Sequence, residues 1–165
     1  MEPEMQRNSL PLQTEFGVVR CARPTDAERI VQMVGKLAAH HGDTPALTAD
    51  DLARDVFVAN PWIYVLVAEA RGELIGYSAL CGLTRLQFGW RGMDMHHLFT
   101  EAAYRGRGVG RSLIAASKIK AIALSCSYLN VGTNPDNHKA QVFYEILGFE
   151  RKNTHPPLFS IRLAS

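Results

Sequence analysis

The sequence predicts an α/β protein (α+β) with a mixed sheet and a layer of helices on each side of it. Two observations lead to this prediction. Short apolar stretches typical of buried or half-buried strands recur along the chain, and runs with apolar residues three and four positions apart lie between them. In order, these segments read β-α-α-β-β-β-α-β-α-β, which favours helices packed on both faces of one sheet.

The composition fits one globular domain of ordinary size. The chain has 165 residues, of which 47% are hydrophobic, and no apolar run approaches the roughly 20 residues that cross a bilayer. The start of the chain is polar and lacks the basic and apolar regions of a signal peptide, so we expect a cytoplasmic protein without a membrane partner. We predict a loose arm over residues 1–14 and one domain over residues 15–165.

Charge and cysteine content argue against several classes of protein. The formal net charge of +2 is too small to indicate a nucleic-acid partner. The three cysteines, Cys21, Cys81 and Cys126, are far apart, odd in number and placed among apolar neighbours. This pattern disfavours a disulfide framework or a zinc site, so we expect buried free thiols and no metal.

The first half of the chain is predicted to contain two helices and three strands. A strand over residues 16–23 comes first. Each helix then begins at a capping-box pattern, Thr25–Glu28 for the first and Thr48–Asp51 for the second. Residues 62–68 are apolar on both faces, as in a strand inside a sheet, and a turn leads from them to an antiparallel strand at 74–80.

The second half is predicted to add three strands and two helices. Residues 82–92 place glycines among strand-forming residues and are interpreted as a bend or loop. The remaining segments are a strand at 93–100, a long amphipathic helix from Val109 to Ala123, a strand at 128–132, a helix between Asn137 and Gly148, and a last strand at 158–163.

The stretch Tyr104–Gly110, YRGRGVG, joins the strand at 93–100 to the long helix. Glycine weakens both elements, so three glycines at this junction need a compensating role. Backbone amides at the start of a helix are unpaired donors, glycines let a phosphate reach them, and arginines add positive charge. The spacing fits neither a Walker A loop nor the dinucleotide-binding fingerprint. We interpret the stretch as a phosphate cradle, with a flexible basic turn as the alternative.

Two motifs together resemble those of the GCN5-related N-acetyltransferase (GNAT) family. The first is Arg105-x-x-Gly108-x-Gly110 at the strand-to-helix junction. The second follows on the last helix and reads Asn137-x-x-Ala140-x-x-Phe143-Tyr144-x-x-x-Gly148-Phe149. The resemblance extends from about Phe16 to the end of the chain. It implies the GNAT fold, a mixed and mostly antiparallel sheet of six to seven strands with helices on both faces.

The middle of the chain is similar to one branch of that family, the diamine (spermidine/spermine) and thialysine N-acetyltransferases. The similarity lies in Gly76-Tyr77, in Trp90-Arg91-Gly92 and in the strand end Leu98-Phe99-Thr100. That branch commonly has Glu-Asp just before this strand end, whereas this chain has His96-His97. Imidazoles therefore stand where the branch has a pair of carboxylates that could attract a polyamine.

The resemblance implies acetyl-CoA as co-substrate and no metal. Its pyrophosphate would lie on the amides of the glycine stretch, and its pantetheine arm would pair with the strand end as an extra strand in a splayed sheet. A backbone amide near Leu98 would donate to the acetyl oxygen as negative charge develops. The residues implied in cofactor binding are Leu98, Phe99, Thr100, Arg105, Gly106, Arg107, Gly108, Val109, Gly110, Arg111, Asn137 and Tyr144.

Two residues are candidates for catalysis. Tyr144 matches the position of the acid that returns a proton to the leaving thiolate, the alternative being a packing residue of the last helix. A primary amine is mostly protonated at neutral pH, so a base is useful, and imidazole titrates in the right range. Strand alternation puts Asp94, His96 and Leu98 on one face and Met95, His97 and Phe99 on the other. We prefer His96 as base, with a core or rim role as the alternative.

We therefore expect an enzyme that transfers an acetyl group from acetyl-CoA to the primary amine of a small molecule, directly and without a covalent intermediate. His40 and His41 lie where this family often forms its substrate rim, and Tyr77 and Trp90 are candidates to line the acceptor site. The alternatives are a non-catalytic CoA-binding sensor on the same fold and an N-acetyltransferase of protein or peptide amines. A homodimer is an expectation from the branch, without a residue that carries it.

Overall fold

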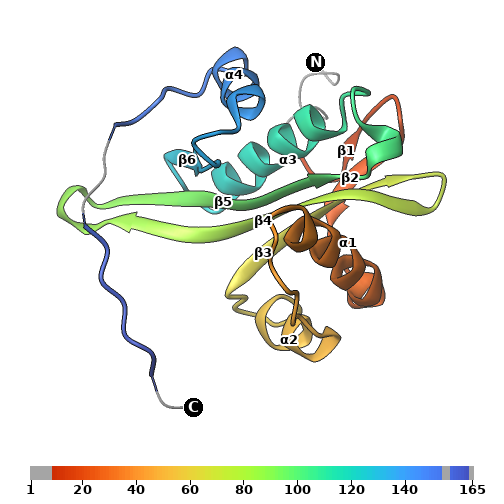
Figure 1. The fold of residues 1–165 in the computed structure, drawn as a ribbon, viewed down its shortest axis with the longest axis horizontal. Coiled ribbons are helices and arrows are strands. Elements are labelled where there is room, and N and C mark those ends of the chain that lie inside the picture. The colour runs from red at the N-terminus through yellow and green to blue at the C-terminus, as the bar shows by residue number, and fades with distance from the viewer. Residues whose placement is uncertain (1–8, 154–156, 164–165) are drawn as a thin grey trace. The chain divides into compact units, whose positions relative to one another are not determined.

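The computed structural model describes residues 9–153 and 157–163, and the chain divides into two compact units, residues 1–132 and 133–165. A six-stranded sheet runs through the first unit, with its strands in chain order from edge to edge (Figure 1). These strands are β1 (Leu12–Gln13), β2 (Val18–Cys21), β3 (Ile63–Ala70), β4 (Glu73–Arg85), β5 (Trp90–Thr100) and β6 (Tyr128–Val131). The second unit contains α4 (His138–Ile146).

Neighbouring strands are antiparallel, except that β5 and β6 are parallel. Helices α1 (Ala27–His40) and α2 (Ala49–Asp55) lie on one face of the sheet, here called the α1 face. Helix α3 (Val109–Ala123) lies on the opposite face, the α3 face, and connects β5 to β6 (Figure 1). The structure thus confirms the predicted mixed, mostly antiparallel sheet with helices on both faces.

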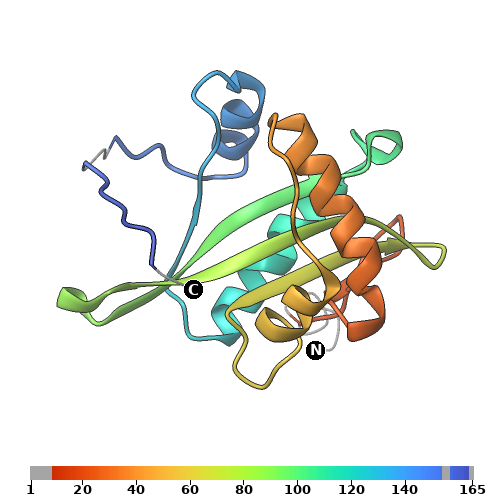
Figure 2. The ribbon, with the colours of Figure 1, turned by 60° about the horizontal axis from the view of Figure 1, so that its bottom comes forward.

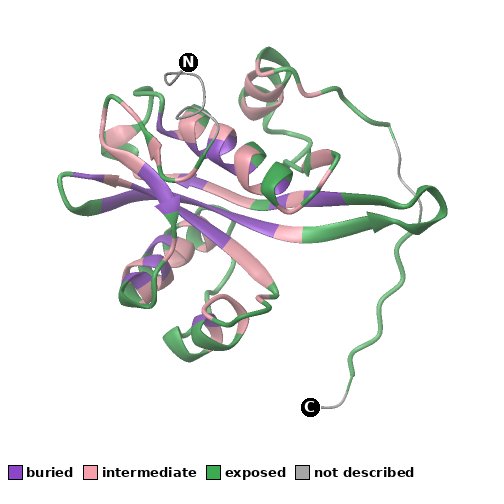
Figure 3. Cartoon of the chain, turned by 180° about the vertical axis from the view of Figure 1, so that it is seen from behind, coloured by how far each residue is buried: buried purple, intermediate pink, exposed green. Residues whose placement is uncertain are grey.

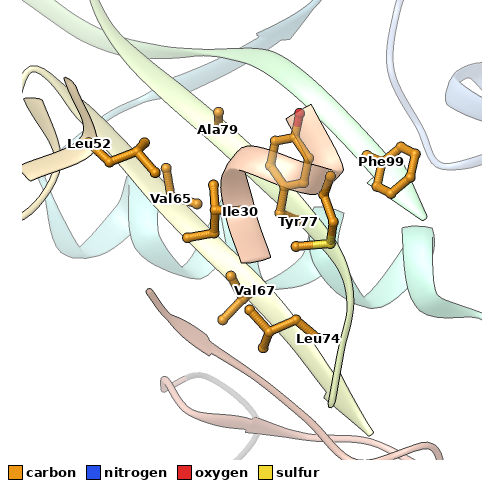
Figure 4. Packing of buried hydrophobic residues seen from close by; sticks show 9 residues of the cluster. Ile30, Leu52, Val65, Val67, Leu74, Tyr77, Ala79 and Phe99 are labelled. Carbon is orange, nitrogen blue, oxygen red and sulfur yellow. The ribbon is translucent and has the colours of Figure 1, made fainter. Parts of the chain in front are cut away.

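The core of the α1 face joins both helices to the middle of the sheet (Figure 4). Ile30 and Met33 come from the same side of α1, and Leu52 comes from α2. The strands contribute side chains two residues apart, as the pleat requires, except between Leu74 and Tyr77, where a bulge at Ile75 adds one residue. These buried strand residues are Val65, Val67, Leu74, Tyr77, Ala79 and Phe99. Figure 3 shows that burial is concentrated along the central strands.

A buried ion cluster links the first part of the sheet to the entrance of α1. Arg20 of β2 donates to Asp26 Oδ2 (2.8 Å) and, through Nε, to Glu69 Oε2 of β3 (2.8 Å). Burial opposes ionisation of Asp26, yet hydrogen bonds from Arg20 and from the amide of Arg23 hold the pKa of Asp26 below its ordinary value. A paired charge of this kind is tolerated inside a protein because each ion satisfies the other.

The two predicted capping boxes have different outcomes. The second is confirmed, because Thr48 Oγ1 accepts from the amide of Asp51 (3.2 Å) and Asp51 accepts from the amide of Thr48 (2.9 Å). At the first, the predicted pair Thr25–Glu28 is wrong. A short 3-10 turn at Pro24–Asp26 precedes α1, and Asp26 accepts from the amide of Arg23 instead.

Residues 82–92 form the end of a long hairpin rather than the predicted bend or loop. Strand β4 continues to Arg85 and β5 begins at Trp90, with a short 3-10 turn at Leu86–Phe88 between them. Figure 2 shows this hairpin extending beyond the part of the sheet that α1 and α2 cover. Of the glycines that indicated a loop, Gly82 and Gly92 are accommodated in strands, whereas Gly89 lies in the turn with a φ of 64°. Gly92 allows close packing, because a Cβ there would meet the ring of Tyr128.

Three other expectations differ from the structure. The strand predicted at 158–163 does not form, and Leu158 and Phe159 are exposed. The arm predicted over residues 1–14 enters the sheet at its end, where β1 pairs with β2, and residues 1–8 lie outside the described residues. The cysteines carry free thiols, but Cys21 is exposed and the other two are only half-buried, so the expectation of buried thiols is wrong.

Candidate acetyl-transfer site

The sheet opens between β5 and β6. Strand β6 pairs only with Gly92–Met95, and it ends at Val131. Beyond this point β5 continues to Thr100 and, among the described residues, pairs only with β4 on its other side. The segment His96–Thr100 therefore presents one backbone edge without a strand partner, which is the splay that the resemblance implied.

The glycine stretch ends at the start of α3 in a conformation that demands glycine. Gly106 and Gly108 have φ values of 73° and 82°, in the left-handed region that side chains disfavour. A Cβ at either position would meet no protein atom within 4 Å, so the space beside them is open. The first helical hydrogen bond runs from the amide of Ser112 to the carbonyl of Gly108 (3.0 Å), so the amides before Ser112 precede the helical ladder.

The arginines of the stretch are exposed and only partly committed to the protein. Arg105 donates through Nε to the carbonyl of Thr100 (3.3 Å), and the guanidinium of Arg107 lies 5.5 Å from the ring centroid of Tyr104. Arg111 is exposed in the first turn of α3. Positive charge, open space and amides that precede the helical ladder thus gather at one helix start. This combination fits a pyrophosphate, and it indicates a phosphate site more strongly than a helix start alone would.

An ion-pair network fixes the chain between β5 and this helix start. The amide of Glu101 donates to the carbonyl of Ile75 (2.8 Å), and its carboxylate accepts from Arg29 (2.7 Å) and Lys36 (2.8 Å) of α1. Partial burial opposes ionisation, but hydrogen bonds from both cations hold the pKa of Glu101 below its ordinary value. The sequence offered no signal for this contact, because its partners lie far apart along the chain.

A β-bulge at His96 decides which side chains share a face. Ala79 pairs with His97, but Leu80 pairs with Met95, so His96 is the extra residue. The predicted strict alternation is wrong for this reason. His97 shares the α1 face with its partner Ala79, whereas Met95 shares the α3 face with Leu80. His96 itself is exposed.

His97 is held between the core and its histidine neighbours. A hydrogen bond joins Tyr77 Oη to His97 Nδ1 (3.0 Å), and Figure 4 shows the hydroxyl of Tyr77 pointing away from the core cluster around its ring. The ring of His96 is stacked on that of His97, with centroids 4.3 Å apart. Burial, together with the nearby positive charge of His96 and His41, lowers the pKa of His97 to about 4. The imidazole of His97 is therefore neutral at physiological pH.

The predicted residues of the second unit lie on α4. Asn137 is the N-cap of this helix, and its side chain accepts from the amide of Ala140 (3.1 Å). Tyr144 lies on the next turns, with ring contacts to Phe143 and Phe149 at 5.7 Å each. Burial raises the pKa of Tyr144 above its ordinary value, so the phenol keeps its proton.

The structure brings some of the predicted acceptor residues together and separates others. His41 follows the last residue of α1 and lies close enough to His97 to affect its pKa. Tyr77 contributes its hydroxyl, but its ring belongs to the core. Trp90 begins β5 at the opposite end of the strand from Thr100, where it contacts Phe88. Trp90 therefore does not join the histidines as predicted.

The family model for the acetyltransferase (GNAT) domain matches residues 61–151. This chain belongs to the GNAT acetyltransferase family. The match covers β3 to α4, which contain the splay, the bulge and the glycine stretch. The predicted family is thereby confirmed, and the open space beside Gly106 and Gly108 would suit the phosphates of acetyl-CoA, the co-substrate that the resemblance implied.

Three relatives resemble the GNAT chain in sequence. The uncharacterized protein ML0378 of Mycobacterium leprae is 32% identical over 143 residues, which are 84% of this chain and 36% of that protein. The spermidine/spermine N(1)-acetyltransferase-like protein 1 of Homo sapiens is 28% identical over 124 residues, 70% of this chain and 18% of that protein. The N-alpha-acetyltransferase RimI of Mycobacterium tuberculosis is 31% identical over 139 residues, 84% of this chain and 81% of that protein. The chain thus spans about a third or less of the first two.

One solved structure illustrates the shared fold. An aminoglycoside N-acetyltransferase determined in complex with CoA has a TM-score of 0.67 and 20% identity, and the match covers 88% of this chain and 99% of that one. At this identity the likeness concerns the fold alone. Within the described residues of the GNAT chain, no group of three or more His, Cys, Asp or Glu side chains could hold a metal ion. None of its described helices is long and apolar enough to cross a membrane.

Proposed function

We propose that this GNAT protein transfers an acetyl group from acetyl-CoA to the primary amine of a small molecule, directly and without a covalent enzyme intermediate. The observation that supports this most is the adjacency of two features along β5. The strand has an unpaired backbone edge at His96–Thr100, and the glycine-rich helix start follows it within a few residues. An edge that can hold an extended chain and amides that can hold phosphates suit the two parts of acetyl-CoA.

The cofactor side is assigned to the residues that form this edge and helix start. The amides and side chains of Arg105, Gly106, Arg107, Gly108, Val109, Gly110 and Arg111 hold the pyrophosphate. The backbone of Leu98, Phe99 and Thr100 pairs with the pantetheine arm. Acetyl-CoA supplies the activated acetyl group, and a backbone amide near Leu98 donates to its oxygen as negative charge develops.

The acceptor side is assigned to the bulge. His96 is exposed and can exchange protons with solvent, so it serves as the base that takes a proton from the incoming ammonium. His97, neutral and hydrogen-bonded to Tyr77, holds the ring of His96 in place through their stacking contact. In this assignment His97 is a positioning residue and His96 is the catalytic residue.

Two residues of α4 are assigned roles from the family motif that they match. Tyr144, whose phenol keeps its proton, returns a proton to the thiolate as CoA leaves. Asn137 contacts the pantetheine arm in addition to capping α4.

A second acceptor class is a peptide N-terminus. The observation that favours it is the similarity to the N-alpha-acetyltransferase RimI of M. tuberculosis, 31% identical across 81% of that protein. Both acceptors present a primary amine, so the same bulge and glycine stretch would serve either.

The test is thiol release from acetyl-CoA against a panel of acceptors, namely polyamines, lysine analogues, amino acids and short peptides. Turnover with small amines but not with peptides is expected. Turnover with peptides alone would replace the small-molecule proposal by the peptide one. CoA binding measured by calorimetry without any acceptor turnover would favour a CoA-binding sensor instead.

A further inference from the structure

The exposed chain between β5 and α3 is attached to neighbouring elements through Glu101. Residues 102–107 are exposed apart from Tyr104, which is half-buried. The amide of Tyr104 donates to the carbonyl of Glu101 (2.9 Å), and Nε of Arg105 donates to the carbonyl of Thr100 (3.3 Å). Among the described residues, no hydrogen bond from residues 102–107 reaches beyond the end of β5. The position of the glycine stretch therefore depends on how the end of β5 is held.

Glu101 holds this end with both its backbone and its side chain. Its amide donates to the carbonyl of Ile75 in β4 (2.8 Å). Its carboxylate accepts from Arg29 (2.7 Å) and from Lys36 (2.8 Å), which lie seven residues apart and so on the same side of α1. Arg29 also donates to the carbonyl of Leu74 (3.0 Å). One half-buried carboxylate thus joins the end of β5 to α1, which is joined in turn to β4.

The charge of Glu101 does not explain why it lies so few residues before a phosphate site. Partial burial opposes its ionisation, yet hydrogen bonds from Lys36 and Arg29 hold the pKa of Glu101 below its ordinary value, and a carboxylate repels phosphates. The two cations outnumber the carboxylate, so the network as a whole does not repel an anion. What the carboxylate adds is position, because a site supported by packed helices and strands is held more precisely than one on a free loop.

We propose that Glu101 is a positioning residue for the phosphates of CoA. By fixing the end of β5 to α1, it keeps the amides of residues 105–110 in the arrangement that receives the pyrophosphate. Without this attachment, the stretch would have to be ordered when CoA binds, at a cost in affinity. The proposal rests on the cofactor site of the proposed function and adds α1 to it, although no residue of α1 is assigned to contact CoA.

The test measures the Kd for CoA by calorimetry in Glu101→Gln, which keeps the size of the side chain and removes its charge. The Kd is expected to rise about 10-fold, the size of ordering one or two loop side chains on binding. The direction of the change is decisive. If Glu101 acted only through its charge, losing a negative charge near an anion site would lower the Kd.

Glu69→Gln is the matched control, because it makes the same change in a half-buried ion pair with Arg20 on another part of the sheet. Its Kd for CoA should equal that of the wild type. Lys36→Gln keeps the proposal testable if Glu101→Gln fails to fold, since Lys36 is half exposed. It should raise the Kd about threefold alone and add nothing to Glu101→Gln, because the lysine acts through the carboxylate.

An unchanged or lower Kd in Glu101→Gln, or an equal rise in Glu69→Gln, would overturn the proposal. Additive losses for Lys36→Gln and Glu101→Gln would also overturn it, because they would show the lysine acting on CoA without the carboxylate. A wild-type protein that does not bind CoA would reject the cofactor site itself, together with this inference. Wild-type binding that Glu101→Gln leaves intact would reject the inference alone.

Discussion

At the scale of single residues, His97 shows how a fold sets the charge of a side chain. Its imidazole lies beside the core, next to Tyr77, and has two other histidines nearby. Each of these surroundings penalises the protonated form, either by removing water or by adding like charge. The neutral ring that results can hold a hydrogen bond to Tyr77 throughout the physiological range of pH.

This charge state has a consequence for stability. The pKa of His97 is about 4 in the folded chain and near 6.5 when unfolded. The unfolded chain therefore binds more protons between these values, and the free energy of unfolding should fall as pH drops from about 6.5 to 4. Urea denaturation across this range should show a weaker pH dependence for His97→Gln than for the wild type. An unchanged slope would place the titration of His97 in its ordinary range.

Tyr144 has a kinetic consequence. Tyr144→Phe removes only the hydroxyl, so it should lower turnover about 100-fold or more if the phenol is the general acid. The Kd for CoA should stay within about twofold, because the ring remains in contact with Phe143 and Phe149. Stopped-flow turnover and calorimetry measure the two quantities. Wild-type turnover in this variant would make Tyr144 a packing residue.

At the scale of elements, the glycine stretch combines a strained backbone with an exposed helix start. Gly108→Glu should abolish CoA binding, because the side chain would bring bulk and negative charge into the open space beside the amides. Gly72→Glu is a matched control, since Gly72 has a similar φ of 81° and equally open surroundings at a distant turn. Calorimetry should show binding for the control alone. Equal loss in both variants would point to backbone strain rather than phosphate contact.

The ion cluster of β2, β3 and the turn before α1 is expected to dominate local stability. Arg20→Ala leaves the buried Asp26 without its partner, which should cost about 3–5 kcal/mol of the free energy of unfolding. Arg54→Ala removes an exposed ion pair and should change little. Urea denaturation of both variants at neutral pH makes the comparison. A loss for Arg20→Ala no larger than that for Arg54→Ala would show that the cluster contributes nothing beyond a surface pair.

At the scale of the whole molecule, the spacing of apolar residues predicted most helices and strands. Burial of one side of a helix or strand imposes this spacing directly. Helix α3 was placed at its observed bounds, and β6 was placed to within one residue, since both have regular apolar spacing and clear ends. The hairpin through residues 82–92 was missed, because its tip lies outside the core and exposed strands need no alternation.

The candidate site was predictable only in part. The glycine stretch could be predicted because its glycines are required by the local backbone conformation, so they stand out in the sequence. The facing of Asp94 and His97 depends on the bulge, and the contact of Glu101 with Arg29 and Lys36 depends on elements distant in the chain. No local pattern encodes either arrangement. The segment 158–163 shows the reverse case, in which a strand-like pattern has no strand partner among the described residues.

The bulge also allows β5 to contain one extra residue without changing the direction of the neighbouring side chains. Because His96 is an extra residue, the segments before and after it keep the facing they would have in a regular hairpin one residue shorter. Deleting His96 should therefore leave the circular dichroism spectrum and the core unchanged, whereas deleting Met95 or His97 would remove a paired residue. Position 96 is thus a place where the length of β5 can change by one residue without rotating the neighbouring side chains. Alignments of relatives should accordingly permit a gap there.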